Sequence, residues 1–384
     1  MSPVRLGILG CGNVLTAYRT TIERLRQSGL AVVARACGRE SQRSAAQACL
    51  GDVPFTVEAR DLVQAPDVDA IVVLTSMPQH AALARSALEA GKHVLVEKPF
   101  ATRIEDGLAL LELARRGPSH LVCAPFTTLS PTFRALLRRL RNGDIGKVCS
   151  ARARYGWSGP WWNEWFYRPG GGCLFDLGIY SVTTLTGLLG PARRVLAMTG
   201  IAVPEREIQG RSIAVEAEDT AQVLLDFGAG TSAVVTTGFT IQKYRSPALE
   251  LYGTTGVLQL LGDDWDPDGY ELWQNATGCW QLYPETHPDW PWTDGLRDLV
   301  EAIHDRRPPE TRIDHALHVL EVLLAAQRSG REGRAIDIQY DFEPLTLPSA
   351  SPDTSTEPAH RVHDRTREHG PAPQQPPPVP SSSS

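Results

Sequence analysis

Apolar residues follow two different patterns along this chain. Up to about residue 125, short runs that are apolar on both faces are separated by amphipathic stretches. Such runs, bounded by Gly, Pro or charge, are typical of buried parallel strands. The predicted strands are residues 4–9, 31–37, 69–74, 93–96 and 121–124, and the predicted helices are residues 16–27, 80–90 and 105–115. Strands that alternate with helices predict a parallel sheet with helices on both faces.

After about residue 147 the strands are longer and are joined by glycine-containing turns. Hairpin turns at 226–231 and 253–256 indicate an antiparallel sheet. The predicted strands are residues 150–155, 194–202, 214–227, 231–242, 248–253, 257–261 and 335–338, and the predicted helices are residues 174–189, 296–304 and 315–327. The predicted fold is therefore α/β followed by α+β. Residues 1–125 form a Rossmann-type domain, and residues 126–345 form a domain for substrate and oligomerisation, with a large, mostly antiparallel sheet.

The last segment, residues 346–384, has a different composition. From Ser349 it is rich in Pro, Ser and charge, and it ends in four serines. Such a composition buries too little apolar surface to offset the entropy of ordering, which predicts a disordered tail. The alternative is a peptide ligand for a partner protein.

The composition of the chain argues against several classes of protein. The net charge is −6 and the pI is about 6.0, so the chain is not expected to bind nucleic acid. No apolar run reaches about 18 residues, and no signal peptide is recognisable, so no membrane association is expected. The seven cysteines are scattered without a CxxC pair. This predicts free thiols in the cytoplasm and no metal site.

A glycine turn follows the first predicted strand. Gly10 permits a tight turn, and Gly12 lets the backbone approach a pyrophosphate at the start of the next helix, where Asn13 and Val14 lie. The third glycine of a dinucleotide-binding fingerprint is replaced by Leu15. The alternative is an ordinary turn between strand and helix.

The end of the second predicted strand bears on the choice of cofactor. An acidic residue there binds the ribose hydroxyls of NAD, whereas this chain has Gly38 and Arg39, with Arg43 one turn later. A small residue followed by arginine leaves room and charge for a 2′-phosphate, so NADP(H) is favoured over NAD(H). In the alternative, Glu40 turns inward to the ribose and Arg39 is solvated.

Residues 91–99 read Gly-Lys-His-Val-Leu-Val-Glu-Lys-Pro. Together with the Gly10 turn, the Pro78-Gln79-His80 segment, and three glycines at 170–172 followed by Asp176, this motif resembles the glucose–fructose oxidoreductase / inositol dehydrogenase / rhizopine catabolism family. The resemblance extends over residues 4–340. It implies that Lys98 faces both the nicotinamide and the substrate alcohol. It also implies that Glu97 lies beside the nicotinamide ribose and that Pro99 follows a cis bond.

The resemblance implies further residues around the cofactor. Thr75, Ser76 and Pro78 follow the fourth strand and would border the dinucleotide. His80 would either cap the helix that begins there or contact the cofactor. The alternative without a functional role is that Glu97 and Lys98 form an ion pair on the protein surface.

A second set of residues lies near position 176. Positions four apart share a helix face, so Asp176 and Tyr180 are expected to converge on one pocket. Tyrosine at the second position resembles the branch that contains glucose–fructose oxidoreductase and dihydrodiol dehydrogenase, where it transfers the proton. Hydride transfer to or from an alcohol requires such a group. Lys98 would stabilise the phenolate and Asp176 would hold Lys98. The alternative for Tyr180 is packing in the core.

Residues 155–168 are dense in tryptophan and tyrosine. Trp162 would stack on the apolar face of a sugar, and Arg168 would meet a carboxylate or phosphate. The alternative is that these aromatic residues pack a long loop onto the sheet.

We expect an NAD(P)-dependent oxidoreductase that acts on a sugar, a polyol or a nucleotide-linked keto-sugar. The open face of the second sheet should pair with another copy, which would give a homodimer or homotetramer. One rival is a redox-neutral glycosidase with tightly held NAD, and release of cofactor during turnover would argue against it. The other is a non-catalytic sensor of the same fold, against which the intact Lys98, Asp176 and Tyr180 speak.

Overall fold

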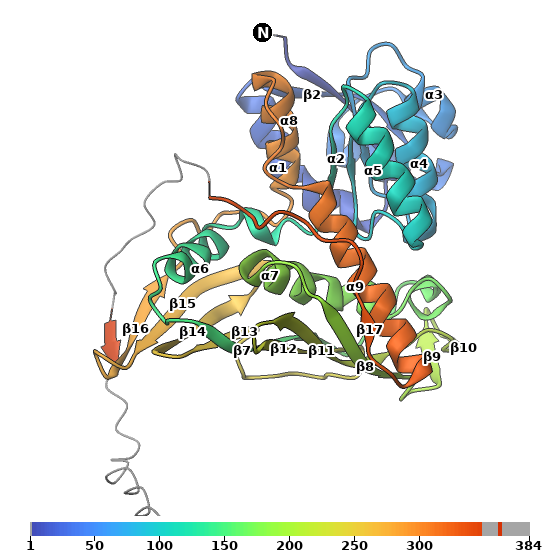
Figure 1. Cartoon of the computed structure of the whole chain (residues 1–384). Helices are drawn as coiled ribbons and strands as arrows, with labels where there is room; N and C mark the ends of the chain where they lie inside the picture. The colour runs from blue at the N-terminus through green and yellow to red at the C-terminus, as the bar shows by residue number, and fades with distance from the viewer. Residues whose placement is uncertain (1, 348–359, 363–384) are drawn as a thin grey trace, which may run out of the picture.

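The computed structural model describes residues 2–347 and 360–362. Two layered units lie one above the other (Figure 1). The upper unit contains a six-stranded sheet in the order β3-β2-β1-β4-β5-β6, and all of its strand pairs are parallel. Its strands are β1 Val4–Leu9, β2 Ala31–Cys37, β3 Phe55–Thr56, β4 Ala70–Val73, β5 His93–Val96 and β6 Leu121–Cys123. This is the sheet order of dinucleotide-binding domains.

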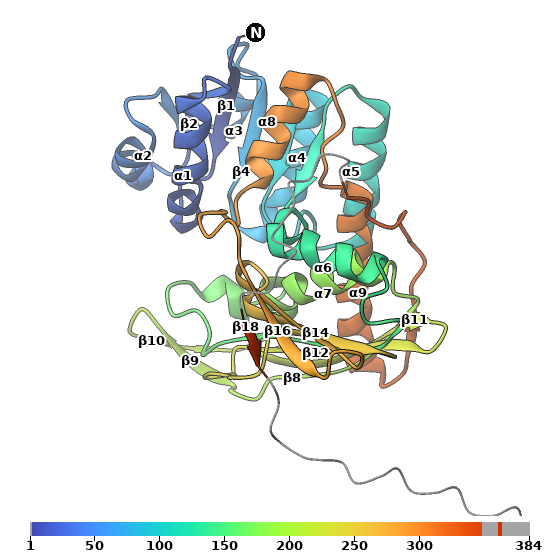
Figure 2. The ribbon, with the colours of Figure 1, turned by 90° about the vertical axis from the view of Figure 1, so that its left-hand side faces the viewer.

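Helices cover both faces of this sheet, as predicted. Helix α1 lies on one face, and α3, α4 and α5 lie on the other (Figures 1 and 2). The bounds are α1 Asn13–Gln27, α2 Arg43–Leu50, α3 Ala59–Val63, α4 Met77–Glu89 and α5 Ile104–Arg116. Strands β1, β4 and β5 are almost fully buried, which explains why they are apolar on both faces.

The predicted domain boundary at residue 125 separates segments that pack together in the structure. Helix α8, Gly295–Asp305, is assigned by sequence to the second domain. Its residues Leu296, Leu299 and Val300 are instead buried in the core of the first unit, beside α1 and β1 (Figure 2). The chain therefore returns to the Rossmann unit and closes the face on which α1 lies.

The lower unit is a ten-stranded mixed sheet in the order β17-β8-β11-β12-β7-β13-β14-β15-β16-β18. Only the β12–β7 pair is parallel, so the predicted mostly antiparallel sheet is confirmed. Its strands are β7 Val148–Gly156, β8 Arg194–Gly200, β11 Thr220–Gly228, β12 Thr231–Gly238, β13 Leu249–Gly253, β14 Gly256–Asp263, β15 Asp266–Gln274, β16 Cys279–Pro284, β17 Ile336–Asp337 and β18 His360–Val362.

Helices lie on the upper face of this sheet, toward the Rossmann unit (Figure 1). They are α6 Pro131–Arg141, α7 Ile179–Leu189 and α9 Ile313–Glu332. Helix α9 contacts β8 and α7 below and α5 above, so it joins the two units. No helix covers the lower face in the described part of the chain (Figures 1 and 2).

Several predicted bounds are wrong. The segment 214–227 is not one strand, because its strand β11 begins only at Thr220 and residue 214 ends β10 Arg211–Ala214, which forms a separate hairpin with β9 Glu205–Ile208. Strand β12 ends at Gly238, well before 242. Strands β15 and β16 and helix α6 were not predicted. Within the predicted tail, β18 pairs with β16, and the other residues beyond 347 lie outside the described residues.

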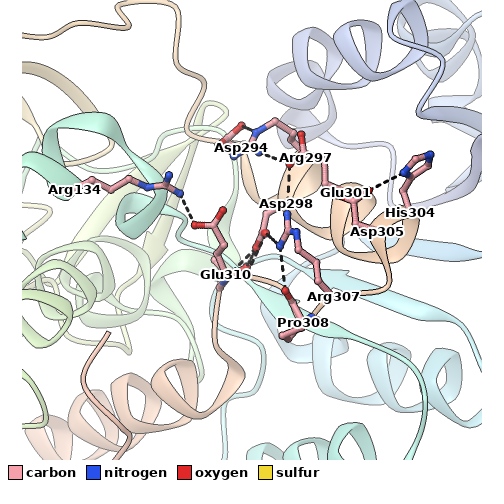
Figure 3. A network of polar contacts seen from close by, with 11 residues as sticks. Arg134, Asp294, Arg297, Asp298, Glu301, His304, Asp305, Arg307, Pro308 and Glu310 are labelled. Carbon is pink, nitrogen blue, oxygen red and sulfur yellow. Dashed lines mark hydrogen bonds and ion pairs between the residues drawn. The ribbon is translucent and has the colours of Figure 1, made fainter. Parts of the chain in front are cut away.

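The polypeptide between α8 and α9 is held by a buried carboxylate. Asp298 is fully buried and accepts hydrogen bonds from the backbone N–H groups of Glu310 and Thr311, each at 3.0 Å. Arg307 lies 3.1 Å from the same carboxylate. Glu310 in turn pairs with Arg134 of α6 at 2.7 Å, so the network connects the two units (Figure 3).

No helix of the described residues combines the length and apolarity needed to cross a membrane. All seven cysteines are free thiols.

Candidate active site

A cleft of about 1260 Å³ lies between the carboxyl ends of the parallel strands and the aromatic segment that follows β7. Ligands bind at this edge in open α/β sheets. Most of the predicted site residues line the cleft: Gly10, Gly12, Asn13, Val14, Gly38, Arg39, Thr75, Ser76, Glu97, Lys98, Trp162, Asp176 and Tyr180. Pro78, His80 and Arg168 are not among its lining residues.

The glycine turn has the backbone that the sequence predicts. Gly10 has φ +106°, and a Cβ there would lie 2.7 Å from the backbone of Leu74. Gly12 is the N-cap of α1, with no side-chain cap and no acidic residue in the first turn. A Cβ on Gly12 would meet only Gln42, at 3.7 Å. The helix start is therefore open to an anion, which its dipole attracts.

At the end of β2, the two candidate residues for the ribose face differently. Glu40 forms an ion pair with Arg43 at 2.7 Å and does not line the cleft. Arg39 lines the cleft and forms no ion pair with any described residue. The amide of Gln42, which sequence reasoning missed, accepts a hydrogen bond from the Arg39 backbone N–H at 3.0 Å.

His80 neither caps a helix nor contacts the cleft. It is buried, and its ring nitrogens lie 2.8 Å from the Pro99 carbonyl and 2.9 Å from the Thr75 carbonyl. Burial lowers its pKa, so the ring is neutral. The ring therefore ties the loop after β4 to the loop after β5. The Lys98–Pro99 bond is cis, as predicted.

Glu97 is a buried carboxylate at the floor of the cleft, with 5% of its surface exposed. One oxygen accepts the Tyr18 hydroxyl at 2.7 Å, and the other accepts the Lys98 backbone N–H at 3.2 Å. Tyr18 is fully buried on α1, and its ring meets Trp292 edge-on at 6.1 Å. The carboxylate is thus held by Tyr18 and by the Lys98 backbone, and Trp292 packs against the ring of Tyr18.

Lys98 and Asp176 form an ion pair across the two units. The Lys98 Nζ donates to Oδ1 of Asp176 at 2.8 Å and to its carbonyl oxygen at 2.7 Å. The same ammonium lies 5.1 Å from the centre of the Tyr180 ring. Asp176 belongs to a π-helical turn, Leu174–Gly178, and Tyr180 to α7. The spacing argument assumed an uninterrupted α-helix, yet both residues line the cleft.

The phenol of Tyr180 is hard to ionise. Burial, together with the negative charges of Glu97, Asp176 and Asp264, raises its pKa well above the usual value. This differs from the expectation that Lys98 makes the phenol easier to ionise. The ammonium is directed to Asp176, and burial is the largest cause of the raised pKa of Tyr180.

The aromatic segment provides one wall of the cleft. Trp162 stacks on Trp157 with ring centres 5.5 Å apart and lines the cleft. Trp165 stacks on Phe166 at 3.7 Å. These residues therefore pack the loop and also line the cleft, and the stacking of a sugar on Trp162 stays a prediction. Arg168 does not line the cleft and pairs instead with Glu216 and, at 3.4 Å, with Glu164, which does line it.

Sequence reasoning missed several contributors to the cleft. Gln42 lines it, and Tyr18 lies behind Glu97 without lining it; both occupy ordinary helical positions, and neither residue type signals a ligand. Trp292 lines the cleft and comes from the segment before α8, far along the chain from Tyr18, which its ring contacts. The β9–β10 hairpin contributes Arg211 beside the aromatic wall. Only the tertiary fold brings these residues together.

Two family models match this chain. Residues 4–123 match "Oxidoreductase family, NAD-binding Rossmann fold", and residues 133–259 match "GFO/IDH/MocA C-terminal domain". The chain belongs to the GFO/IDH/MocA oxidoreductase family. The predicted resemblance, the fold class and the assignment as an oxidoreductase are confirmed.

Curated relatives of this family member include a dehydrogenase and a reductase. Trans-1,2-dihydrobenzene-1,2-diol dehydrogenase of Macaca fuscata fuscata is 30% identical over 69% of this chain and 76% of the relative. The dTDP-3,4-didehydro-2,6-dideoxy-alpha-D-glucose 3-reductase of Saccharopolyspora spinosa is 31% identical over 66% of this chain and 73% of the relative.

Solved structures of similar proteins share the fold of this oxidoreductase. The WlbA dehydrogenase from Bordetella pertussis, in complex with NADH and UDP-GlcNAcA, has a TM-score of 0.72 at 23% identity, covering 88% of this chain and 100% of that one. Levoglucosan dehydrogenase, in complex with NADH and levoglucosan, has a TM-score of 0.76 at 19% identity, with the same coverage.

Proposed function

We propose that this oxidoreductase reduces the ketone of a cyclic, sugar-like substrate with NADPH, and catalyses the reverse oxidation more slowly at neutral pH. The observation that carries the proposal is the cluster of Lys98, Asp176 and Tyr180 in the same cleft as the glycine turn. A dinucleotide that begins at Gly12 and a substrate that contacts the aromatic wall would meet at this cluster.

The residues present fit a dinucleotide. The open start of α1 at Gly12 suits a pyrophosphate, and the Thr75 hydroxyl is buried without a partner in the described structure. Arg39 pairs with no carboxylate in the part of the chain that the structure describes, which supports NADP(H) over NAD(H). When bound, the reduced nicotinamide supplies the hydride. Glu97 would lie beside its ribose, in the position that Tyr18 fixes.

The proton in this reduction comes from the protein. As the carbonyl carbon gains a hydride, its oxygen gains negative charge and needs a proton. A tyrosine is protonated at neutral pH, since its ordinary pKa is about 10, and burial raises the pKa of Tyr180 further, so its hydroxyl can donate that proton. The Lys98 ammonium stabilises the developing alkoxide, and Asp176 holds the ammonium in place. The products are the alcohol and the oxidised dinucleotide, and the Tyr180 phenolate regains its proton from solvent.

The proposed substrate is a sugar, a polyol or a nucleotide-linked keto-sugar. The relatives named above act on a cyclic diol and on a dTDP-linked keto-sugar. Trp162 and Trp157 offer flat apolar surfaces for a sugar ring. We further propose a homo-oligomer formed through the open face of the large sheet. The seven free thiols support a cytoplasmic location.

A screen of keto-sugars and polyols with NADP(H) and NAD(H) tests the proposal, and the absorbance of the reduced nicotinamide measures turnover. We expect turnover with at least one keto-sugar. For that substrate, Lys98→Ala should lower turnover by about 100-fold or more, as expected for loss of a positioned group in proton transfer. Affinity for NADPH, measured by fluorescence titration, should change much less. Wild-type turnover in Lys98→Ala would refute the assigned role.

A further inference from the structure

A second hollow of about 580 Å³ lies next to the catalytic cleft. It is formed by the β12–β13 connection and the end of β14, and the proposed reaction does not use it. Tyr155 and Trp157 line both spaces, so the two are neighbours across a shared aromatic wall. The second hollow is further lined by Lys243, Tyr244, Arg245, Asp263 and Trp265.

A row of rings leads from the reacting centre to this hollow. The Tyr155 ring meets Tyr180 edge-on at 5.3 Å, and the same ring lies 6.4 Å from Trp265. Ring centres at these separations are in contact range. A substrate whose carbonyl lies at Tyr180 would therefore need to extend past only one aromatic ring to reach the hollow.

The charge of the hollow differs in sign from that of the whole chain. Lys243 and Arg245 are exposed, and neither forms an ion pair or hydrogen bond within the described part of the chain. Among the described residues that line the hollow, Asp263 is the one carboxylate, and it accepts the Tyr244 hydroxyl at 2.6 Å. Two cations and one anion leave a positive wall on a protein with a net charge of −6. Unpaired cations beside a concave surface are suited to an anionic group.

We infer that this second hollow is a subsite for an anionic group, a phosphate or a carboxylate, on the same sugar-like substrate that reacts at Tyr180. The inference rests on the proposed function and specifies its substrate class. Lys243 and Arg245 bind the anion, while Tyr155 and Trp157 contact the part of the molecule between the anion and the reacting carbon.

Calorimetric or NMR titration with three probes tests this inference. The probes share a glucose ring and differ in charge: glucose 6-phosphate, D-glucuronate and neutral glucose. The protein is saturated with NADPH so that the anions do not occupy the dinucleotide part of the cleft. The test variant is Lys243→Gln/Arg245→Gln. The matched control, Arg19→Gln/Arg60→Gln, removes the same charge from exposed positions outside both spaces.

We expect at least one charged probe to bind the wild type about tenfold or more tightly than glucose does. The test variant should lose that advantage, and the control should keep it to within about twofold. The charged probe that binds more tightly distinguishes phosphate from carboxylate. Equal binding of all three probes, or an equal loss in the control, would overturn the subsite.

The outcome can be separated from that of the proposed reaction. Tyr180→Phe should abolish turnover and leave probe affinity unchanged, because the anion binds beyond Tyr155. For an anionic substrate, the test variant should raise KM by about tenfold or more with little change in kcat. Turnover of neutral sugars with no preference for charged probes would refute the subsite alone. Probe binding without any turnover would refute the reaction.

Discussion

Burial, together with the charges of Glu97, Asp176 and Asp264, raises the pKa of Tyr180 above its usual value. A raised pKa means that the group is an acid throughout the neutral range and becomes a base only at higher pH. Reduction should therefore show no loss of kcat/KM from about pH 6 to about pH 9, whereas oxidation of the alcohol should accelerate over that range. Initial rates in both directions, with matched buffers, measure this. A reduction rate that falls steadily above about pH 7 would contradict the role.

Arg39 is expected to determine the choice between the two dinucleotides. A charge-assisted contact with the 2′-phosphate contributes about 1.5–3 kcal/mol, so Arg39→Ala should weaken NADPH binding by roughly 10- to 100-fold. NADH lacks this phosphate and should bind almost unchanged. Titration of both cofactors measures the difference, with Arg43→Ala as a control because Arg43 pairs with Glu40. A wild type that prefers NADH, or an equal loss for both cofactors, would show that the assignment to NADP(H) is wrong.

At the scale of elements, the prediction from sequence succeeded where one physical signal dominates. Buried parallel strands such as β4 are apolar throughout, and the glycine turn at Gly10 requires a positive φ that few other residues adopt. The residues predicted from these motifs line the cleft, apart from Pro78, His80 and Arg168. His80 has buried carbonyl partners, and Arg168 has two nearby carboxylates, neither of which is visible in the local sequence.

The missed elements have locally ambiguous sequences. Strand β15 contains Pro267 and Gly269, two residue types that are typical of turns. The structure nevertheless requires glycine at position 269, because a Cβ there would lie 2.2 Å from the Tyr283 carbonyl oxygen. The apolar alternation at 214–227 conceals Asp219, a fully buried carboxylate that accepts the backbone N–H groups of Ala202 and Val203. Long-range hydrogen bonds of this kind override local pattern.

The junction between α8 and α9 depends on one side chain. Asp298→Ala would leave the buried backbone N–H of Thr311 and the partly buried N–H of Glu310 without an acceptor, and Arg307 would keep only Glu301 as an ion-pair partner within the described part of the chain (Figure 3). We expect the free energy of unfolding to fall by about 3 kcal/mol. Urea denaturation measures this, with Asp305→Ala as the control, since Asp305 is exposed and pairs only with His304 among the described residues. A change of less than about 0.5 kcal/mol for Asp298→Ala would contradict the structural account.

At the scale of the whole molecule, the large sheet is covered on one side only (Figures 1 and 2). Residues of β11 alternate between a buried face, with Val223 and Leu225, and an exposed face, with Leu224. Leu224 lies opposite Leu196 of β8 and Val234 of β12, and all three are at least 40% exposed. Met198 adds to this face with 79% exposed. A contiguous apolar surface across three strands is typical of an interface.

The exposed apolar residues make the proposed oligomer testable at one position. If two copies pair through this face, Leu224→Arg places a charge at its centre, where burial without a partner is costly. We expect the wild type to sediment as a dimer or tetramer at micromolar concentration and Leu224→Arg to sediment at a lower mass with an unchanged circular dichroism spectrum. Thr20→Arg, on the exposed side of α1, should keep the wild-type mass. A monomeric wild type would contradict the oligomer. An unchanged mass in Leu224→Arg would place the interface on another surface, because the apolar face of β8, β11 and β12 could not then be what holds the copies together.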